Sequence, residues 1–228
     1  MSASGMRAAR PVGANMARWL ADIVSGKSLV LAPDDEAATR AAELAEAWAD
    51  AIPPVYRWAS LDDPRLGRCG QIARFVDTAR DLVAAPVLPR RITLAGDAGD
   101  GKTLLGVAIL RALSRRRLHS PMFVSSPDLA EARIQTRAGQ GEAPLVIAAT
   151  RAPLLLLDDL GMAAPTHRDA NVSVIDDRFK TGATTIVTTG FTLDQLATKY
   201  GDGIARRVFG SAAHAGGDVW IVDFRGVP

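Results

Sequence analysis

The sequence has one cysteine, Cys69, among its 228 residues. A lone cysteine excludes an internal disulfide and a zinc site made of several thiolates. The three histidines, His119, His167 and His214, lie far apart and do not have the spacing of metal ligands. Nothing in this composition predicts a thiolate or histidine metal centre.

Long apolar runs and a strong net charge are missing as well. No run of about 18 apolar residues occurs, and residues 1–11 lack the apolar core of a signal peptide. The net charge is +2, so any basic surface must be local. We therefore expect a cytoplasmic protein with no membrane contact, long enough for one sizeable α/β domain and a small extra segment.

Two helical patterns precede a pair of prolines. Apolar residues at helical spacing predict helices over residues 15–24 and 35–52, after a tail of about ten residues. The pair Pro53 and Pro54 ends the second helix and marks a boundary in the chain.

Beyond this boundary, short apolar runs alternate with helical patterns. We predict strands over residues 92–95, 122–125, 154–158, 185–188 and 219–224. We predict helices over residues 102–116, 127–137, 171–179 and 193–199. Ser126 and Pro127 are typical of an N-cap and a first helical turn. Because residues 154–157 are all leucine, as in a strand buried on both faces, the pattern favours a doubly wound α/β domain: a five-stranded parallel sheet flanked by helices.

A glycine-rich loop carries the clearest chemical pattern. Residues 96–103 fit G-x-x-x-x-G-K-[ST], in which backbone N–H groups cradle phosphates, the lysine approaches the β- and γ-phosphates, and the hydroxyl binds Mg²⁺. The loop follows an apolar strand and opens an apolar helix, as this motif requires. We therefore predict binding of ATP and Mg²⁺, with the nucleotide held by Gly96, Asp97, Ala98, Gly99, Asp100, Gly101, Lys102, Thr103 and Leu104.

Two carboxylates follow the leucine run. Ligands of open α/β sheets bind at the carboxyl edge of the strands, where these side chains would lie. We predict that Asp158 and Thr103 hold Mg²⁺, and that Asp159 orients or deprotonates the attacking water. Asp158 and Asp159 follow the phosphate loop by one strand–helix unit, and this spacing indicates ATP hydrolysis.

Several short segments occur in a characteristic order, over residues 56–62, 122–129, 157–161, 185–189, 193–196, 200–201 and 223–225. In this order the chain resembles the DnaC/IstB-like AAA+ ATPases, the family of bacterial replicative helicase loaders. The resemblance covers about residues 55–228. It implies a P-loop AAA+ domain with a reduced C-terminal lid, ATP-dependent homo-oligomers and contact with single-stranded DNA. We accordingly divide the chain into a helical N-terminal partner-binding segment, residues 1–54, and an AAA+ ATPase domain, residues 55–228.

The resemblance also gives roles to two arginines. Arg207 matches the arginine finger that reaches a neighbouring subunit's ATP, although Arg206 beside it could substitute. Arg225 matches the second sensor, which touches the γ-phosphate in its own subunit. A guanidinium suits both roles because it stays charged and can bond two phosphate oxygens.

Three features depart from the family pattern. Gly190 stands where the family usually has a first-sensor asparagine, so a γ-phosphate contact must come from Thr188 or Thr189, or be absent. Asp159 replaces the commoner glutamate. The carboxylates of Asp97 and Asp100 lie inside the phosphate loop, where they would repel ATP. Together these departures predict slow hydrolysis, as in a nucleotide-gated switch.

Basic residues give only a weak indication of DNA binding. Arg115, Arg116 and Arg117 end a predicted helix, where a solvated face is the simpler interpretation. Arg133 and Arg137 are four apart and would share a helix face, so they are better candidates for phosphate contacts. No aromatic residues interleave with these arginines as a stacking platform.

The leading hypothesis is a DnaC-type helicase loader whose N-terminal helices grip a replicative DNA helicase. An IstB-like transposition helper ATPase is an alternative, although the longer, leucine-rich N-terminal region of that family is not found here. A nucleotide-binding adaptor with little hydrolysis is a further alternative. A small-molecule kinase is disfavoured because nothing indicates an acceptor-binding lid or a separate base.

Overall fold

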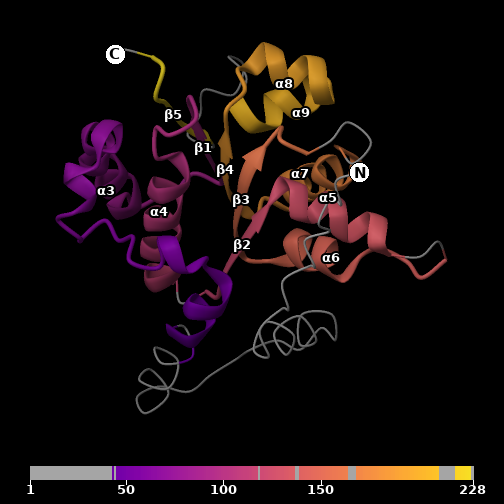
Figure 1. The fold of residues 1–228 in the computed structure, drawn as a ribbon, viewed down its shortest axis with the longest axis horizontal. Helices are drawn as coiled ribbons and strands as arrows, with labels where there is room; N and C mark the ends of the chain where they lie inside the picture. Colours follow the sequence, from indigo (N-terminus) through magenta and orange to yellow (C-terminus); the bar gives the residue numbers. More distant parts are fainter. Residues whose placement is uncertain are drawn as a thin grey trace, which may run out of the picture.

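A computed structural model describes residues 43, 45–117, 119–136, 139–163, 168–210 and 219–226. Its centre is a five-stranded sheet in the order β2-β3-β4-β1-β5, in which every neighbouring pair is parallel (Figure 1). The strands are β1 (Arg91–Ala95), β2 (Pro121–Ser125), β3 (Leu154–Leu160), β4 (Thr184–Thr189) and β5 (Val219–Asp223). The predicted five-stranded parallel sheet is confirmed.

Helices flank both faces of the sheet, as Figure 1 shows. On one side lie α3 (Val76–Ala84) and α4 (Lys102–Arg117). The other side carries α5 (Ser126–Gln135), α6 (Pro144–Arg151) and α7 (Arg168–Thr181). The pair α8 (Leu193–Tyr200) and α9 (Asp202–Phe209) follows β4, and three short 3₁₀ turns, η1 (Pro54–Tyr56), η2 (Leu66–Arg68) and η3 (Gly70–Phe75), precede α3.

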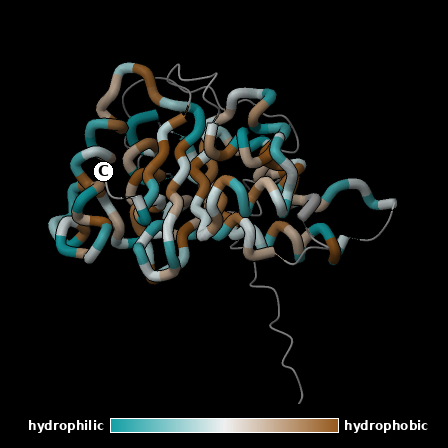
Figure 2. The backbone as a smooth tube through the Cα atoms, turned by 90° about the horizontal axis from the view of Figure 1, so that it is seen from above, coloured by the Kyte–Doolittle hydropathy of each residue, from teal (hydrophilic) through white to brown (hydrophobic). Residues whose placement is uncertain are grey.

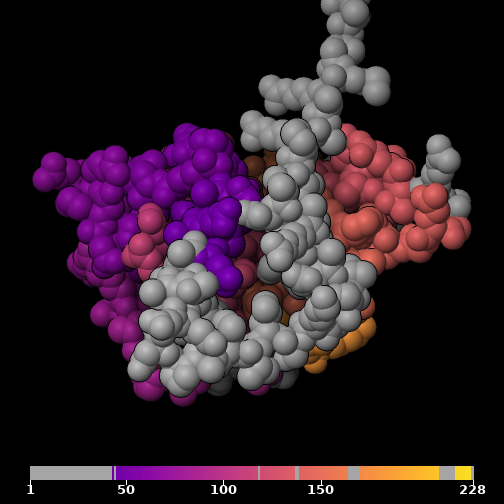
Figure 3. Space-filling model, turned by 90° about the horizontal axis from the view of Figure 1, so that it is seen from below, coloured from indigo at the N-terminus to yellow at the C-terminus, as the bar shows by residue number. Residues whose placement is uncertain are grey.

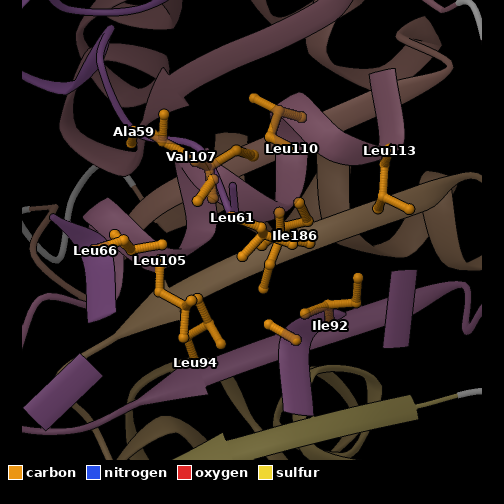
Figure 4. Packing of buried hydrophobic residues seen from close by; sticks show 14 of the residues in the cluster. Ala59, Leu61, Leu66, Ile92, Leu94, Leu105, Val107, Leu110, Leu113 and Ile186 are labelled. Carbon is orange, nitrogen blue, oxygen red and sulfur yellow. The ribbon is translucent and has the colours of Figure 1, made fainter. Parts of the chain in front are cut away.

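The leucines of β3 show how the sheet is buried on both faces. Leu154 and Leu156 pack in the cluster beneath α4, part of which is drawn in Figure 4. Leu155 and Leu157 pack in a second cluster with residues of α5, α6 and α7. All four side chains are fully buried, because successive residues of a strand point to opposite faces. Hydrophobic segments accordingly gather in the middle of the molecule in Figure 2.

Three helices, α3, α6 and α9, are absent from the sequence-based predictions. Each has only eight or nine residues. The predicted N-cap of α5 is wrong by one residue: the cap is Ser125, whose hydroxyl accepts a 3.1 Å hydrogen bond from Asp128 N. Ser126 is instead the first helical residue and is fully buried.

The chain just before the two prolines belongs to the same core. Residues 45–51 are helical, and Trp48 and Ile52 are buried in the cluster beneath α4. The guanidinium carbon of Arg111, in α4, lies 5.3 Å from the Trp48 ring centroid. The Trp48 indole donates a 3.4 Å hydrogen bond to Arg57 O. Packing therefore continues across the predicted boundary at residue 54.

The helix predicted over residues 15–24 lies outside the described residues, as does the first part of the helix predicted over 35–52. In Figure 3 the described residues nearest the N-terminus, in indigo, gather on the side away from α5 and α6. Within the part of the chain that the structure describes, no helix is long and apolar enough to cross a membrane.

Candidate nucleotide-binding site

The glycine-rich loop joins β1 to α4 at the carboxyl edge of the sheet. Gly99 and Gly101 have φ angles of +90° and +88°, in the left-handed region that favours glycine. A Cβ on Gly101 would lie 2.4 Å from Ile72 Cδ1, so no larger residue fits without moving Ile72. Residues 97–99 are exposed to solvent. The loop is thus tightly packed on one side and accessible on the other.

The charged side chains of the loop bond to its own main chain. Asp100 Oδ2 accepts a 2.6 Å hydrogen bond from Asp97 N, which offsets part of the Asp100 charge. Lys102 is buried, and its ammonium donates a 2.6 Å hydrogen bond to Asp97 O. A phosphate in the loop would compete with this carbonyl for the ammonium. Leu104, also predicted to bind the nucleotide, packs against the apolar cluster beneath α4.

Asp158 stands where β3, β4 and α4 meet. Its Oδ1 accepts hydrogen bonds from Thr188 Oγ1 at 2.5 Å and from Thr103 Oγ1 at 2.9 Å. Burial raises the pKa of Asp158; hydrogen bonds from Thr188 and Thr103 oppose this rise, and the nearby Asp159 carboxylate adds to it. The structure therefore brings together the two predicted Mg²⁺ ligands, Thr103 and Asp158.

A hydroxyl, a carboxylate and phosphate oxygens form the donor set that Mg²⁺ prefers, since this ion keeps several waters and binds one or two carboxylates. Among the described residues, no cluster of three or more histidine, cysteine, aspartate or glutamate side chains could hold a metal by itself. The residues at Asp158 thus fit a Mg²⁺ ion that arrives with a nucleotide.

Asp159 has an unusual backbone conformation. Its φ is +54°, and the register between β3 and β4 shifts between Leu157 and Leu160. Asp159 N donates a 2.9 Å hydrogen bond to Thr188 Oγ1, while the residue itself is exposed. Aspartate tolerates this region better than most residues. The turn therefore gives neighbouring carboxylates different environments, one buried at the predicted metal site and one accessible to water.

Thr188 and Thr189, the two candidates for a γ-phosphate contact, already donate their hydroxyl hydrogens within the chain. Thr188 donates to Asp158, and Thr189 donates a 2.7 Å hydrogen bond to Leu160 O. Both residues are fully buried. Gly190 follows them at the exposed end of β4. These hydroxyls thus orient the end of β3.

Arg225 lies close to Gly190. Its Nε donates to Asp223 Oδ1 at 2.9 Å, and its Nη1 lies 3.4 Å from Gly190 O. Burial by itself would raise the pKa of Asp223, but hydrogen bonds from Arg225 outweigh burial and lower it. A Cβ on Gly96 would lie 2.7 Å from the Cβ of Phe224, the residue before Arg225. The structure thus places the predicted second sensor beside the phosphate loop.

The two arginines of α9 differ in their surroundings. Arg207 Nη2 pairs with Asp176 at 2.7 Å, and the Arg207 side chain is 29% exposed. Arg206 is 62% exposed and makes a longer contact, 3.6 Å, with Asp202 in its own helix. Arg207 as the finger stays a prediction. To reach a neighbouring subunit it would have to leave Asp176, whereas Arg206 already lies at the surface.

The basic residues considered for DNA are mostly engaged within the chain. The helix predicted over residues 127–137 is Ser126–Gln135 in the structure, so it ends two residues earlier than predicted. Arg133 forms an ion pair with Glu142, and Arg137 lies outside the described residues. At the end of α4, Arg116 donates to Val83 O and Ala85 O, and Arg117 donates to Thr184 Oγ1.

Tyr56 is a neighbour of the site to which the sequence patterns assign no role. Burial raises its pKa, the Asp158 and Asp159 carboxylates raise it further, and a hydrogen bond with the Thr103 side chain lowers it. Its ring centroid lies 6.5 Å from that of Phe123 in β2. The only signal in the sequence is its place in residues 56–62, one of the segments that carry the family resemblance.

The strand order, the loop after β1 and the carboxylate near the end of β3 define a P-loop AAA+ ATP-binding domain. The family model for the IstB-like ATP binding protein matches residues 80–209, more than half of the chain. The chain therefore belongs to the IstB-like ATP binding protein family. No curated protein matches the sequence at a significant level.

Solved structures agree with this fold. The DnaC helicase loader shares 22% identity at a TM-score of 0.59, over 75% of this chain and 100% of that chain. DnaI shares 24% identity at a TM-score of 0.58, over 77% of this chain and 93% of that chain. AMPPCP-bound DnaA from Aquifex aeolicus shares 17% identity at a TM-score of 0.53, over 76% of this chain and 51% of that chain. At these identities the likeness establishes the AAA+ fold alone.

Proposed function

We propose that this chain is a slow, magnesium-dependent ATPase that acts as a DnaC-type helicase loader in DNA replication. The observation that carries the ATPase proposal is the junction at Asp158, where the first turn of the phosphate-loop helix is bonded to the end of β3. Similarity of fold to the DnaC helicase loader and to DnaI supports the loader role.

In this proposal, each residue of the site has a defined task. Backbone N–H groups of the loop and Lys102 bind the phosphates, while Thr103 and Asp158 hold Mg²⁺. When bound, Mg²⁺ would neutralise charge that develops on the β- and γ-phosphates. The exposed Asp159 carboxylate orients or deprotonates the attacking water, and Arg225 contacts the γ-phosphate within the same subunit.

Hydrolysis can be tested by phosphate release at saturating ATP. Asp159→Asn keeps the shape of the side chain but removes its basicity, so we expect turnover to fall by about 100-fold with ATP affinity little changed. Asp81→Asn, an exposed aspartate on α3, is the matched control and should behave like the wild type. Equal rates in both variants would refute a role for Asp159, and turnover as fast as that of vigorous AAA+ motors would refute slow hydrolysis.

The arginine finger can be tested by mixing inactive variants. Lys102→Ala subunits lack the phosphate-binding cation, and Arg207→Ala subunits lack the predicted finger. If Arg207 acts across subunits, the mixture should regain activity, because an Arg207→Ala subunit binds ATP while its Lys102→Ala neighbour supplies the finger. The same mixture with Arg206→Ala distinguishes the two arginines.

Light scattering with ATP and with ADP tests the proposed ATP-dependent homo-oligomer.

The loader role requires a partner, which we propose is a replicative DNA helicase bound by the N-terminal segment, residues 1–54. Capture with immobilised chain, with and without ATP, should retain a hexameric helicase. The family match also supports a second candidate, an IstB-like transposition helper. Retention of a transposase in place of the helicase would favour that alternative. Normal ATP binding with no measurable phosphate release would favour a nucleotide-binding adaptor.

A further inference from the structure

A separate cavity lies at the opposite edge of the sheet from the phosphate loop. It has a volume of about 110 Å³ and lies between β1, β4, α7 and α9. Its lining includes the buried apolar side chains of Ile175, Val187 and Val208. Arg90 and Arg91, at the start of β1, also line it, and Arg90 is exposed. The cavity thus combines an apolar interior with cationic residues.

An aromatic ring with two guanidiniums lines this cavity. Phe179 is 44% exposed, so part of its ring is open to solvent. The guanidinium carbons of Arg91 and Arg207 lie 5.0 Å and 5.2 Å from its ring centroid. Exposed aromatic rings with neighbouring arginines are the elements on which proteins stack the bases of single strands. These residues come from β1, α7 and α9, so no sequence window contains the platform.

The charges around the ring favour a nucleic acid over an acidic peptide. Asp176 pairs with Arg207 at 2.7 Å and with Lys180 at 2.5 Å. The hydrogen bond from Lys180 lowers the pKa of Asp176, so this carboxylate is ionised at neutral pH. A second carboxylate inserted here would be repelled by the Asp176 carboxylate, whereas an uncharged base would not be repelled. Phosphates could remain at the rim near Arg90.

We propose that this surface, the Phe179 cavity, binds single-stranded nucleic acid, with one base beside Phe179 and neighbouring phosphates near Arg90 and Arg91. A dry cavity of about 150 Å³ admits benzene, so a six-membered pyrimidine ring would enter this smaller, open cavity part way. The inference rests on the proposed function only in that a loader of a replicative helicase would meet single-stranded DNA. Its test omits ATP, so it can fail while the ATPase proposal stands.

The test is fluorescence anisotropy of a labelled oligothymidine of about 20 nucleotides with the full chain. Phe179→Ala should weaken binding about tenfold, because stacking on one aromatic ring is lost. Phe179→Trp should bind within about twofold of the wild type, since it keeps an aromatic face. Arg90→Ala should weaken binding and lower the slope of log affinity against log salt by about one.

Arg115→Ala is the matched control, because Arg115 is an exposed arginine on α4, on the other face of the sheet. It should leave affinity within about twofold of the wild type, whereas Arg90→Ala should not. Unchanged circular dichroism and an unchanged midpoint of urea unfolding in Phe179→Ala would show that the loss is local. Wild-type affinity in Phe179→Ala would overturn the proposal. Displacement of the oligonucleotide by polyglutamate as readily as by unlabelled oligothymidine would overturn it in favour of an acidic protein partner.

Discussion

Replacing Thr188 with valine removes one hydroxyl from the point where β3, β4 and α4 meet. This hydroxyl donates a 2.5 Å hydrogen bond to Asp158 Oδ1 and accepts a 2.9 Å hydrogen bond from Asp159 N. Valine has a similar shape, so the packing around the fully buried side chain should persist. The substitution therefore isolates the effect of two hydrogen bonds.

The expected loss of stability follows from those two bonds. A hydrogen bond to a charged group contributes about 1.5–3 kcal/mol, and an ordinary one such as the partly buried bond from Asp159 N contributes about 0.5–1.5 kcal/mol. Asp158 keeps its 2.9 Å hydrogen bond from Thr103, so its carboxylate is not left without a donor. We expect the free energy of unfolding at pH 7 to fall by about 3 kcal/mol, a substantial part of the total stability of a typical domain, about 5–15 kcal/mol.

Urea unfolding followed by circular dichroism measures this difference, with Thr189→Val as the comparison. Thr189 is equally buried, but its partners, Leu160 O and Phe191 N, are uncharged. Its loss should be smaller, about 1–2 kcal/mol. A loss below about 1 kcal/mol in Thr188→Val, or equal losses in both variants, would refute the reasoning.

The same experiment has a pH dependence of known sign. The folded-state pKa of Asp158 is raised by burial, so the folded chain binds this proton more readily than the unfolded chain. Between the ordinary value of 3.8 and the raised pKa, Asp158 therefore adds stability as the pH falls. Protonation also removes the charged hydrogen bond. The difference between wild type and Thr188→Val should shrink as the pH falls through the raised pKa, and that for Thr189→Val should not.

Two further substitutions test the fold and the rate of hydrolysis. Arg178 is 1% exposed and donates to Thr184 O and to carbonyls at the end of α6; burial lowers its pKa to about 9, so it stays charged at pH 7. Arg178→Met leaves those carbonyls without their donor and should lower the free energy of unfolding by about 3–5 kcal/mol in urea; an unchanged midpoint would contradict this. Gly190→Asn introduces the asparagine that the family resemblance predicts for a first sensor, and a Cβ there would meet only Gly96 O, at 3.8 Å. Phosphate release at saturating ATP should rise several-fold; a folded, ATP-binding variant no faster than the wild type would show that another step limits turnover.

Sequence patterns predicted the sheet and the phosphate loop because their signals are local. A leucine run indicates a buried strand, and the spacing of glycine, lysine and threonine indicates a phosphate-binding loop. The alternation of runs and helices also indicated a parallel sheet. The strand bounds differ from the prediction by no more than two residues, for example at Leu160, because the turn beyond Asp158 still pairs with β4.

The contacts that complete the site could not be predicted because they depend on strand order. Thr188 meets Asp158 across 30 residues of chain, and only the adjacency of β3 and β4 brings them together. Arg207 similarly meets Asp176 through the packing of α7 against α9. Helical spacing likewise does not fix where a helix ends, and α5 ends at Gln135, two residues before the predicted end.

Helix α4 also has a mechanical consequence. Its 16 residues form a rod about 24 Å long, with the phosphate-binding residues at one end. Farther along, Arg111 Nη1 donates to Arg57 O at 3.2 Å and to Ala59 O at 3.3 Å, and its guanidinium covers Trp48. A continuous helix bends little over this length. We therefore expect any tilt of its first turn on nucleotide exchange to be transmitted to the residues around Trp48, so that α4 would act as a lever between the phosphate loop and the chain around Trp48.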